Sequence, residues 1–464
     1  MLTRLRIQGF KNLLNIDVRF GPFTCITGPN AVGKSNLFDA IRFLHLLTQH
    51  PIMEAVKLLR DTKGRAPEPR SLFTAFGGFR APEMRFTVDL LVERDVEDDF
   101  GIPAQAAIST LRYELALRLG EDQGVERLEL AEESLSPIKL EDAGRNLGFP
   151  AKKIFKDSVI QGRRVGDFIS TTSEGAAQIK AHQEGHGGRM VPAPKSSRTV
   201  VNGLASSDFP TILAVHREMA SWKTLLLEPS AMRAPAFYSD QRFIDVRGAN
   251  LPAAVERLRR HEAVEGQVYA SLANKLAELI DDIREVRVKD DEKTETFTLE
   301  VRGRDGVFHP AGSLSDGTLR FLVLATLAID PDTRGVVCLE EPENGIHPAR
   351  IAAMVKLLRD IAVDPLYPVD DENPLRQVIV NTHSPVVVQN VHVNDLVYMD
   401  QQRIVKDDSS GQVAFLRLPP GTWRAQVQRE VPALARGQML PYLPSQDPGS
   451  QALFDFAAEE KALS

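Results

Sequence analysis

The segment Gly28-Pro-Asn-Ala-Val-Gly-Lys34-Ser35 follows a short apolar run, residues 23–27, and precedes apolar residues at Leu37, Ile41, Leu44 and Leu47. The spacing of three and four residues predicts a helix, and the apolar run predicts a buried strand. Glycines let backbone N–H groups curl around a phosphate, and the helix start adds the positive end of its dipole. The alternative is a chance match in a turn. The flanking strand and helix patterns favour a phosphate-binding loop, in which Lys34 neutralises phosphate oxygens and Ser35 ligates Mg²⁺.

Composition and charge narrow the class of protein. The 464 residues allow two or three lobes, because single hydrophobic cores stop growing at smaller sizes. The net charge of −7 gives no overall attraction to nucleic acid, although a local basic groove stays possible. The chain has no apolar run of bilayer-spanning length, and residues 1–7 do not resemble a secretion signal. We therefore expect a cytoplasmic protein without membrane contact.

Two kinds of strand pattern divide the chain. Alternating apolar residues within 86–92, 113–119 and 128–130 predict antiparallel strands that are buried on one face. Wholly apolar runs at 336–339 and 378–380, with an apolar helix at 319–329, predict a buried parallel sheet. The cysteines, Cys25 and Cys338, lie in such runs, so we interpret them as small hydrophobic residues rather than ligands or a disulfide.

These patterns suggest four regions. The expected regions are a split core at 1–60 and 310–400, an antiparallel accessory sheet at 70–135, an inserted lobe at 136–309 and a C-terminal appendage at 401–464. The inserted lobe is expected to contain a long helix with its apolar face from Val268 to Ile283, followed by a strand from Phe297 to Val301. Residues 136–205 show no pattern that assigns a fold.

Polar residues follow the predicted parallel strands. Glu340 and Glu341 end one strand, where the first acid can hold Mg²⁺ and the second can polarise an attacking water. His383 follows the next strand, at the edge where such sheets bind ligands. A solvated turn and a structural histidine are the alternatives, and the glycine loop elsewhere in the chain favours the functional interpretation.

Ser315-Asp316-Gly317-Thr318 stands at the start of the apolar helix. The Ser315 hydroxyl and the free backbone amides of a helix start can bind an anion. The same residues are also what an ordinary N-cap requires. On its own, this segment favours the cap.

The four elements follow one another along the chain as the glycine loop, Ser315-Asp-Gly317, the apolar strand with two acids and the strand with His383. In this order they resemble the ABC-type ATPase heads of the SMC and RecF superfamily. Ile7-Gln-Gly-Phe-Lys-Asn12 is similar to the start of such heads. Glu341-Pro-Glu-Asn-Gly-Ile-His-Pro348 resembles the D-loop of the smaller "predicted AAA ATPase" branch, which includes the ATPase parts of OLD nucleases and of bacterial anti-phage systems. The resemblance implies an α/β P-loop NTPase of the ABC/SMC head type. Such a protein has a mostly parallel sheet core, an antiparallel accessory sheet and an inserted α/β lobe.

The resemblance also implies roles for individual residues. ATP and Mg²⁺ are the expected cofactors, Glu341 and His383 the catalytic residues, and Ser35 and Glu340 the metal ligands. The expected nucleotide contacts are Lys11, Asn12, Gly28, Pro29, Asn30, Ala31, Val32, Gly33, Lys34, Ser35, Asn36, Ser315, Asp316 and Gly317. The sequence departs from the family at Glu340, which replaces an aspartate, at Asp316, which replaces a glycine, and at Thr318, which replaces a glutamine. These changes bear on the rate of turnover more than on ATP binding.

The expected assembly is a head-to-tail homodimer in which ATP is held between the glycine loop of one copy and Ser315 of the other. Two functions stay open. One is a switch that scaffolds or controls a partner effector in anti-phage defence, and the other is a double-stranded DNA-binding ATPase in repair or genome maintenance. The arginines at 257–260 and 163–164 are either phosphate contacts or a solvated face. About eighty residues follow His383, too few for the metal-binding domain of an OLD nuclease.

Overall fold

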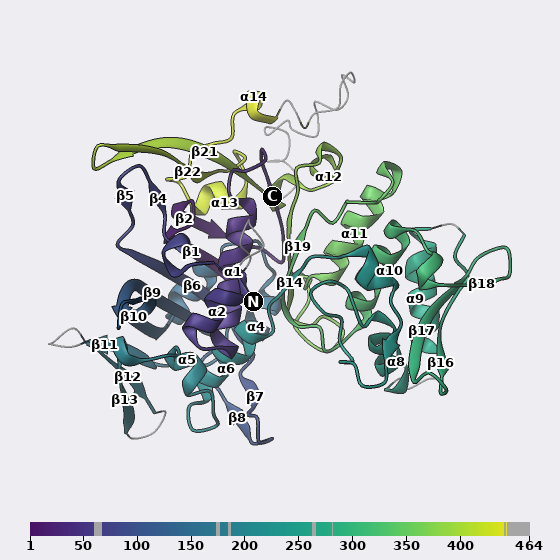
Figure 1. The fold of residues 1–464 in the computed structure, drawn as a ribbon, viewed down its shortest axis with the longest axis horizontal. Coiled ribbons are helices and arrows are strands. Elements are labelled where there is room, and N and C mark those ends of the chain that lie inside the picture. Colours follow the sequence, from purple (N-terminus) through teal and green to yellow (C-terminus); the bar gives the residue numbers. More distant parts are fainter. Residues whose placement is uncertain are drawn as a thin grey trace.

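The computed structural model describes residues 1–59, 67–172, 177–183, 187–261, 266–280, 282–439 and 442. Its centre is a six-stranded sheet in the order β14-β19-β20-β3-β21-β22, in which the first five strands are parallel. Figure 1 labels β14, β19, β21 and β22 of this sheet. The bounds are β14 (Lys223–Leu225), β19 (Gly335–Glu340), β20 (Arg376–Asn381), β3 (Phe23–Thr27), β21 (Leu396–Lys406) and β22 (Ser409–Arg417). This sheet confirms the predicted parallel core.

An eight-stranded antiparallel sheet lies beside it, in the order β13-β12-β11-β10-β9-β6-β1-β2. The bounds are β1 (Leu2–Phe10), β2 (Leu13–Arg19), β6 (Glu83–Leu91), β9 (Thr110–Asp122), β10 (Val125–Pro137), β11 (Ile169–Thr172), β12 (Gln178–His182) and β13 (Gly188–Pro192). The sheet is wider than the expected range of 70–135. The added strands have partners far away in sequence, such as Ile7 opposite Phe86, and a local pattern cannot reveal such pairings.

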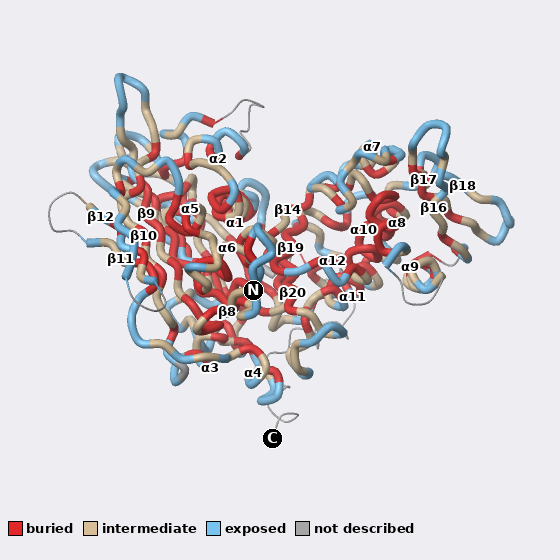
Figure 2. The backbone as a smooth tube through the Cα atoms, turned by 90° about the horizontal axis from the view of Figure 1, so that it is seen from below, coloured by how far each residue is buried: buried red, intermediate tan, exposed pale blue. Residues whose placement is uncertain are grey.

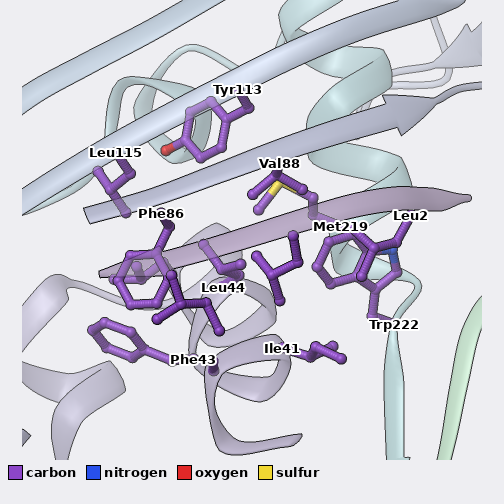
Figure 3. Close-up of a cluster of buried hydrophobic side chains, with 14 of the residues drawn as sticks. Leu2, Ile41, Phe43, Leu44, Phe86, Val88, Tyr113, Leu115, Met219 and Trp222 are labelled. Carbon is purple, nitrogen blue, oxygen red and sulfur yellow. The ribbon is translucent and has the colours of Figure 1, made fainter. Parts of the chain in front are cut away.

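Helices cover both faces of the parallel sheet. One face shares a hydrophobic core with the antiparallel sheet, and α1 (Lys34–Gln49), α2 (Ile52–Leu58), α5 (Val200–Gly203) and α6 (Pro210–Ala220) fill it. Phe43 and Leu44 of α1 lie near Phe86 of β6 in this core (Figure 3). A second core on the opposite face contains α8 (Leu251–Arg260), α9 (Gln267–Ala277), α10 (Asp316–Ile329), α11 (Ile351–Ile361) and α12 (Pro385–Gln389). Figure 2 shows buried chain concentrated along these two layers. Burial on both faces explains the wholly apolar strands.

A smaller sheet packs beyond α8 and α9, with β15 (Ala236–Phe237), β17 (Thr296–Arg302), β16 (Glu285–Asp291) and β18 (Phe308–Pro310). It contains the predicted strand near Phe297. The helix expected to reach Ile283 ends at Ala277, because the chain must turn into β16. Leu279, Ile280 and Ile283 are buried although they lie beyond the end of the helix. Their apolar character therefore indicates burial and does not indicate helical structure.

The expected insertion at 136–309 is therefore divided. Its first part extends the antiparallel sheet through β11, β12 and β13, and residues 223–225 join the parallel sheet as β14. Residues 136–309 also contain the short helices α3 (Leu140–Leu147), α4 (Lys153–Val159) and α7 (Pro229–Arg233). Two short hairpins lie earlier in the chain. One joins β4 (Ala75–Phe76) to β5 (Phe79–Arg80), and the other joins β7 (Asp95–Glu97) to β8 (Pro103–Gln105).

The expected appendage at 401–464 begins inside the core sheet. β21 pairs with β3 and then with β22, so residues 396–417 belong to the parallel layer. Within α13 (Trp423–Val427), Arg424 is fully buried and donates to the backbone oxygen of Arg19 and to Thr24 Oγ1. α14 (Arg436–Met439) follows, and residues 440, 441 and 443–464 lie outside the described residues. Among the described helices, none combines the length and apolar character required to cross a membrane.

Candidate nucleotide-binding site

The glycine loop connects β3 to α1, as the sequence predicts. Gly28 has φ of 144°, and a Cβ there would lie 2.0 Å from the backbone oxygen of Met399 on β21. Gly33 has φ of 115°, and a Cβ there would lie 2.5 Å from Asn12 Oδ1. Both positions combine positive φ with close neighbours, so only glycine fits. The neighbouring strands therefore enforce the shape of this loop.

Lys34 folds back over the loop. Its Nζ donates to the backbone oxygens of Gly28 and Pro29, both at 2.7 Å. Burial lowers the pKa of Lys34, while the carboxylates of Glu341 and Glu343 act in the opposite direction. The side chain is 8% exposed, which places a cation inside the loop where an anion is expected to bind.

The rest of the loop is partly open. Asn30 and Ala31 are exposed, and Val32 is buried in the core below. Ser35 is exposed in the first turn of α1, where its hydroxyl is accessible to a ligand. Gln401 of β21 donates to the backbone oxygen of Ala31 at 2.7 Å, so a residue of the expected appendage supports the loop.

Lys11 and Asn12, expected to contact the nucleotide, contact the loop and its helix. Lys11 Nζ donates to Asp39 Oδ2 at 2.6 Å. Asn12 donates to the backbone oxygen of Val32 at 3.0 Å and accepts from Asn36 at 2.8 Å. These bonds tie the turn between β1 and β2 to the start of α1, so both residues position the loop.

Glu341 and His383 are brought together at the end of the sheet. Glu340 is the last residue of β19 and lies opposite Asn381, the last residue of β20. Glu341 has φ of 45°, and its backbone N–H donates to the Asn381 oxygen at 3.0 Å. Its Oε1 lies 2.9 Å from His383 Nδ1. Both side chains are partly exposed, at 39% and 45%, so this acid and histidine can share a proton and reach a water molecule.

Glu343 is a site residue that the sequence interpretation missed. It is 8% exposed, and its Oε1 accepts from the hydroxyl of Thr382, which precedes His383. Its Oε2 is buried and has no hydrogen-bond partner in the described part of the chain. Burial raises its pKa, and the nearby charge of Glu341 adds to that shift, while the Thr382 bond opposes it. Its position two residues after the predicted pair Glu340-Glu341 was the available signal.

Ser315 caps α10, which confirms the N-cap interpretation. Its Oγ accepts from the backbone N–H of Thr318 at 3.2 Å, and the side chain is exposed. Arg233 of α7 forms an ion pair with Asp316, next to the cap. Gly317 packs on the turn after Glu343, where an added Cβ would lie 2.9 Å from the Gly345 oxygen. The start of α10 therefore packs against the turn that follows Glu343, while Ser315 stays exposed to solvent.

The candidate magnesium ligands are compatible with that ion. Hydroxyl and carboxylate oxygens are the donors that Mg²⁺ prefers. The charges of Glu341 and Glu343 act on Lys34, so carboxylates lie near the glycine loop that precedes Ser35. Among the described residues, no group of three His, Cys, Asp or Glu could hold a metal alone. Ser35 and Glu340 are the two oxygen donors that the sequence predicts for this ion.

Two family models match the chain. Residues 4–51 match a model described as "AAA domain", and this segment contains the glycine loop. Residues 220–389 match a model described as "AAA domain, putative AbiEii toxin, Type IV TA system", and this segment contains Ser315, Glu340, Glu341 and His383.

Two curated relatives carry the name "DNA replication and repair protein RecF". The protein of Magnetococcus marinus is 50% identical over 44 residues, which is 9% of this chain and 12% of the relative. The protein of Paenarthrobacter aurescens is 35% identical over 66 residues, which is 14% of this chain and 16% of the relative. The matches thus cover only a small part of either relative.

The glycine loop between β3 and α1, the parallel sheet and the two AAA matches define the class of protein. The chain has a P-loop NTPase core, and its matched segments are similar to the ATPase heads of the SMC and RecF superfamily. Similar solved structures include an SMC head bound to the C-winged helix domain of ScpA, with 13% identity, a TM-score of 0.47 and coverage of 89% of this chain and 97% of that chain. The SMC head domain from Thermotoga maritima has 14% identity, a TM-score of 0.37 and coverage of 89% and 98%.

Proposed function

We propose that this protein is an ATP-hydrolysing switch whose two copies close around two ATP molecules and thereby control a partner effector. One observation carries the proposal. The glycine loop opens α1 on one face of the parallel sheet, whereas the exposed Ser315 opens α10 on the other. A head-to-tail pair would bring the Ser315 of one copy to the phosphates held by the other, and so would complete the site.

The chemistry follows from the groups around the loop. Lys34 and the loop amides would bind the phosphates, and Mg²⁺ held by Ser35 and Glu340 would neutralise phosphate charge. Glu341 would orient the attacking water and accept its proton, and His383, 2.9 Å away, would stabilise that carboxylate and respond to the terminal phosphate. Hydrolysis would cleave the terminal phosphate that contacts both copies, and the two copies would then separate.

Glu341→Gln tests this mechanism. The amide keeps the size of the side chain and loses the base, so we expect hydrolysis to fall by about 10²- to 10⁴-fold. ATP binding should persist, and the variant should accumulate as an ATP-bound dimer in light-scattering mass measurements. A monomer that hydrolyses ATP at the normal rate would exclude Glu341 as the base. Asn344→Ala is the matched control, because it removes the other contact of the carboxylate and leaves the base in place.

The object of the switch is proposed to be an effector in bacterial anti-phage defence. The description of the longer family match, which names a toxin and a toxin–antitoxin system, supports this choice. The basic cluster suspected of phosphate contact does not favour DNA, since Arg257 pairs with Asp330 and Asp332. Arg259 and Arg260 pair with Glu256 in the same helix.

A DNA-binding ATPase in repair is the second candidate. The RecF matches favour it, as does a cavity of about 550 Å³ whose lining includes Arg6, Arg19 and Arg429. Arg4 also lines this cavity, where it pairs with Asp17. ATPase rates with and without duplex DNA, over a range of salt, separate the candidates. Stimulation that declines with salt favours DNA binding, and release of a copurified effector on hydrolysis favours the first proposal.

A further inference from the structure

A second large cavity lies away from the glycine loop, at the opposite edge of the parallel sheet. Its volume is about 820 Å³, and its lining includes Phe23, the first residue of β3, and Asp395, which directly precedes β21. The glycine loop follows the other end of β3. The cavity is therefore separated from the nucleotide site by the length of the sheet.

Aromatic rings and prolines form the walls of this cavity. Phe149 and Trp423 pack edge to face at 6.4 Å, and Trp423 Nε1 donates to the Asn394 oxygen at 3.0 Å. Tyr367 stands at the rim and is 61% exposed. The remaining apolar lining includes Pro22, Pro150, Pro365 and Pro368. A fixed aromatic floor with an exposed ring at its edge suits the side chains of an extended peptide.

The rim is strongly acidic. It carries Asp360, Asp364, Asp370 and Glu372, while its single arginine, Arg359, pairs with Asp395. Asn373 Nδ2 donates to the backbone oxygens of Asp364 and Pro368, at 3.0 and 2.9 Å. These bonds link the two ends of the acidic loop, and its negative charge favours a cationic occupant.

We propose that this cavity binds a short extended segment of the effector that carries lysine or arginine between apolar residues. The chain's own C-terminal segment has the wrong charge, since residues 443–464 contain Asp447, Asp455, Glu459 and Glu460 against Lys461. Apolar side chains of the effector segment contact Phe149, Tyr367 and Trp423. Its cations lie beside Asp360 and Glu372. The proposal rests on the proposed function, because it gives the switch a place to hold its effector.

Two elements connect this cavity to the nucleotide site. β3 begins at the cavity with Phe23 and ends at Thr27, directly before the glycine loop. α11 begins three residues after the D-loop turn that ends with Pro348, and it ends beside Asp360 and Ala362 of the cavity. A shift of either element on ATP binding would change both sites, so occupancy of the cavity and the nucleotide state are coupled.

Trp423 fluorescence provides a direct test, because the other tryptophan, Trp222, is 2% exposed in a different core. The probe is a capped nine-residue peptide with three Lys-Pro-Leu repeats, and the matched peptide carries glutamate for lysine. We expect saturable binding of the lysine peptide alone, weakened by salt. Tyr367→Ala and the double variant Asp360→Asn/Glu372→Gln should each weaken binding by about fivefold or more.

The double variant Glu121→Gln/Asp408→Asn is the control, since both acids are exposed and away from the cavity. Equal binding of both peptides, no change in Trp423 fluorescence, or unchanged binding by the cavity variants would overturn the docking proposal. Measuring without nucleotide, and in parallel with the ATPase assay, separates the two proposals. If the peptide binds but the protein has no ATPase activity, only the proposed ATP switch is contradicted. If ATP-dependent dimers form normally but the peptide does not bind, only the docking proposal is contradicted.

Discussion

The two halves of the proposed ATP site differ in how much of each is assembled within one copy. In the glycine loop, Lys34, Asn12 and Gln401 already bond to loop oxygens, and close neighbours enforce glycine at positions 28 and 33. At the start of α10, the Ser315 hydroxyl is exposed, and its hydrogen bonds within the described part of the chain are to Thr318 of its own helix turn. Under the proposed mechanism, the first half would therefore bind a nucleotide without help from another copy, whereas the second half would act only on the nucleotide held by a partner copy.

Lys34→Ala should break the first half of the site, and with it every later step that requires bound nucleotide. It removes the buried cation from the loop, and the loss of a charge-assisted contact of about 1.5–3 kcal/mol predicts at least tenfold weaker ATP binding. Calorimetric titration with ATP measures this loss. Unchanged affinity would show that the loop does not hold the phosphates. Thermal unfolding without nucleotide provides the control for folding.

Ser315→Arg should break the second half and spare the first. A long cation at an exposed cap obstructs the partner copy, so ATP binding should stay within about twofold while hydrolysis falls by about 10²-fold. The ATP-dependent dimer should disappear in mass measurements. Normal dimers with normal turnover would contradict the composite site. Ser313→Arg, two residues earlier and also exposed, tests whether the position matters.

Glu343→Gln sharpens the comparison between the glycine loop and the start of α10. Glu343 lies near Lys34 of the loop, the turn that follows it packs against Gly317 of α10, and the proposed mechanism gives it no role in hydrolysis. The amide can keep the Thr382 contact but removes the buried charge near Lys34. We expect about a threefold to tenfold loss of turnover, with ATP affinity nearly unchanged, as for a residue that acts by orienting others. A loss as large as that of Glu341→Gln would instead assign Glu343 a direct part in hydrolysis.

The smallest effect should arise outside both halves, at Glu133 in the antiparallel sheet. Its carboxylate accepts from the N–H groups of Val200 and Val201 and from Tyr113, and burial raises its pKa from 4.5 to about 7. Between these two values the folded protein holds a proton that the unfolded chain has lost. Stability from this group is therefore present near pH 4.5 and decreases as the pH rises to 7.

Urea unfolding at several pH values measures this contribution. The decrease in unfolding free energy between pH 4.5 and 7 should be smaller in Glu133→Gln than in the original chain. An identical pH dependence in both proteins would contradict the raised pKa. ATP binding at fixed pH should not change, because Glu133 does not contact the glycine loop.

The site illustrates what could be predicted and what could not. The glycine loop was predictable because strand, loop and helix are consecutive in the chain, and each has its own local pattern. Glu341 and His383 were proposed singly, but their contact requires β19 and β20 to be neighbours. Glu343 was missed because its burial and its bond to Thr382 exist only in the folded chain.

The same division holds for the fold. The sequence by itself determined the parallel core and its phosphate loop, since wholly apolar strands and glycine spacing are local consequences of burial and backbone geometry. Tertiary structure alone decided that β1 and β2 join the antiparallel sheet, that β14 and β21 complete the core, and that Asn12 and Gln401 brace the loop. These contacts join residues far apart in sequence, and their free energy depends on which surfaces meet, which no local pattern records.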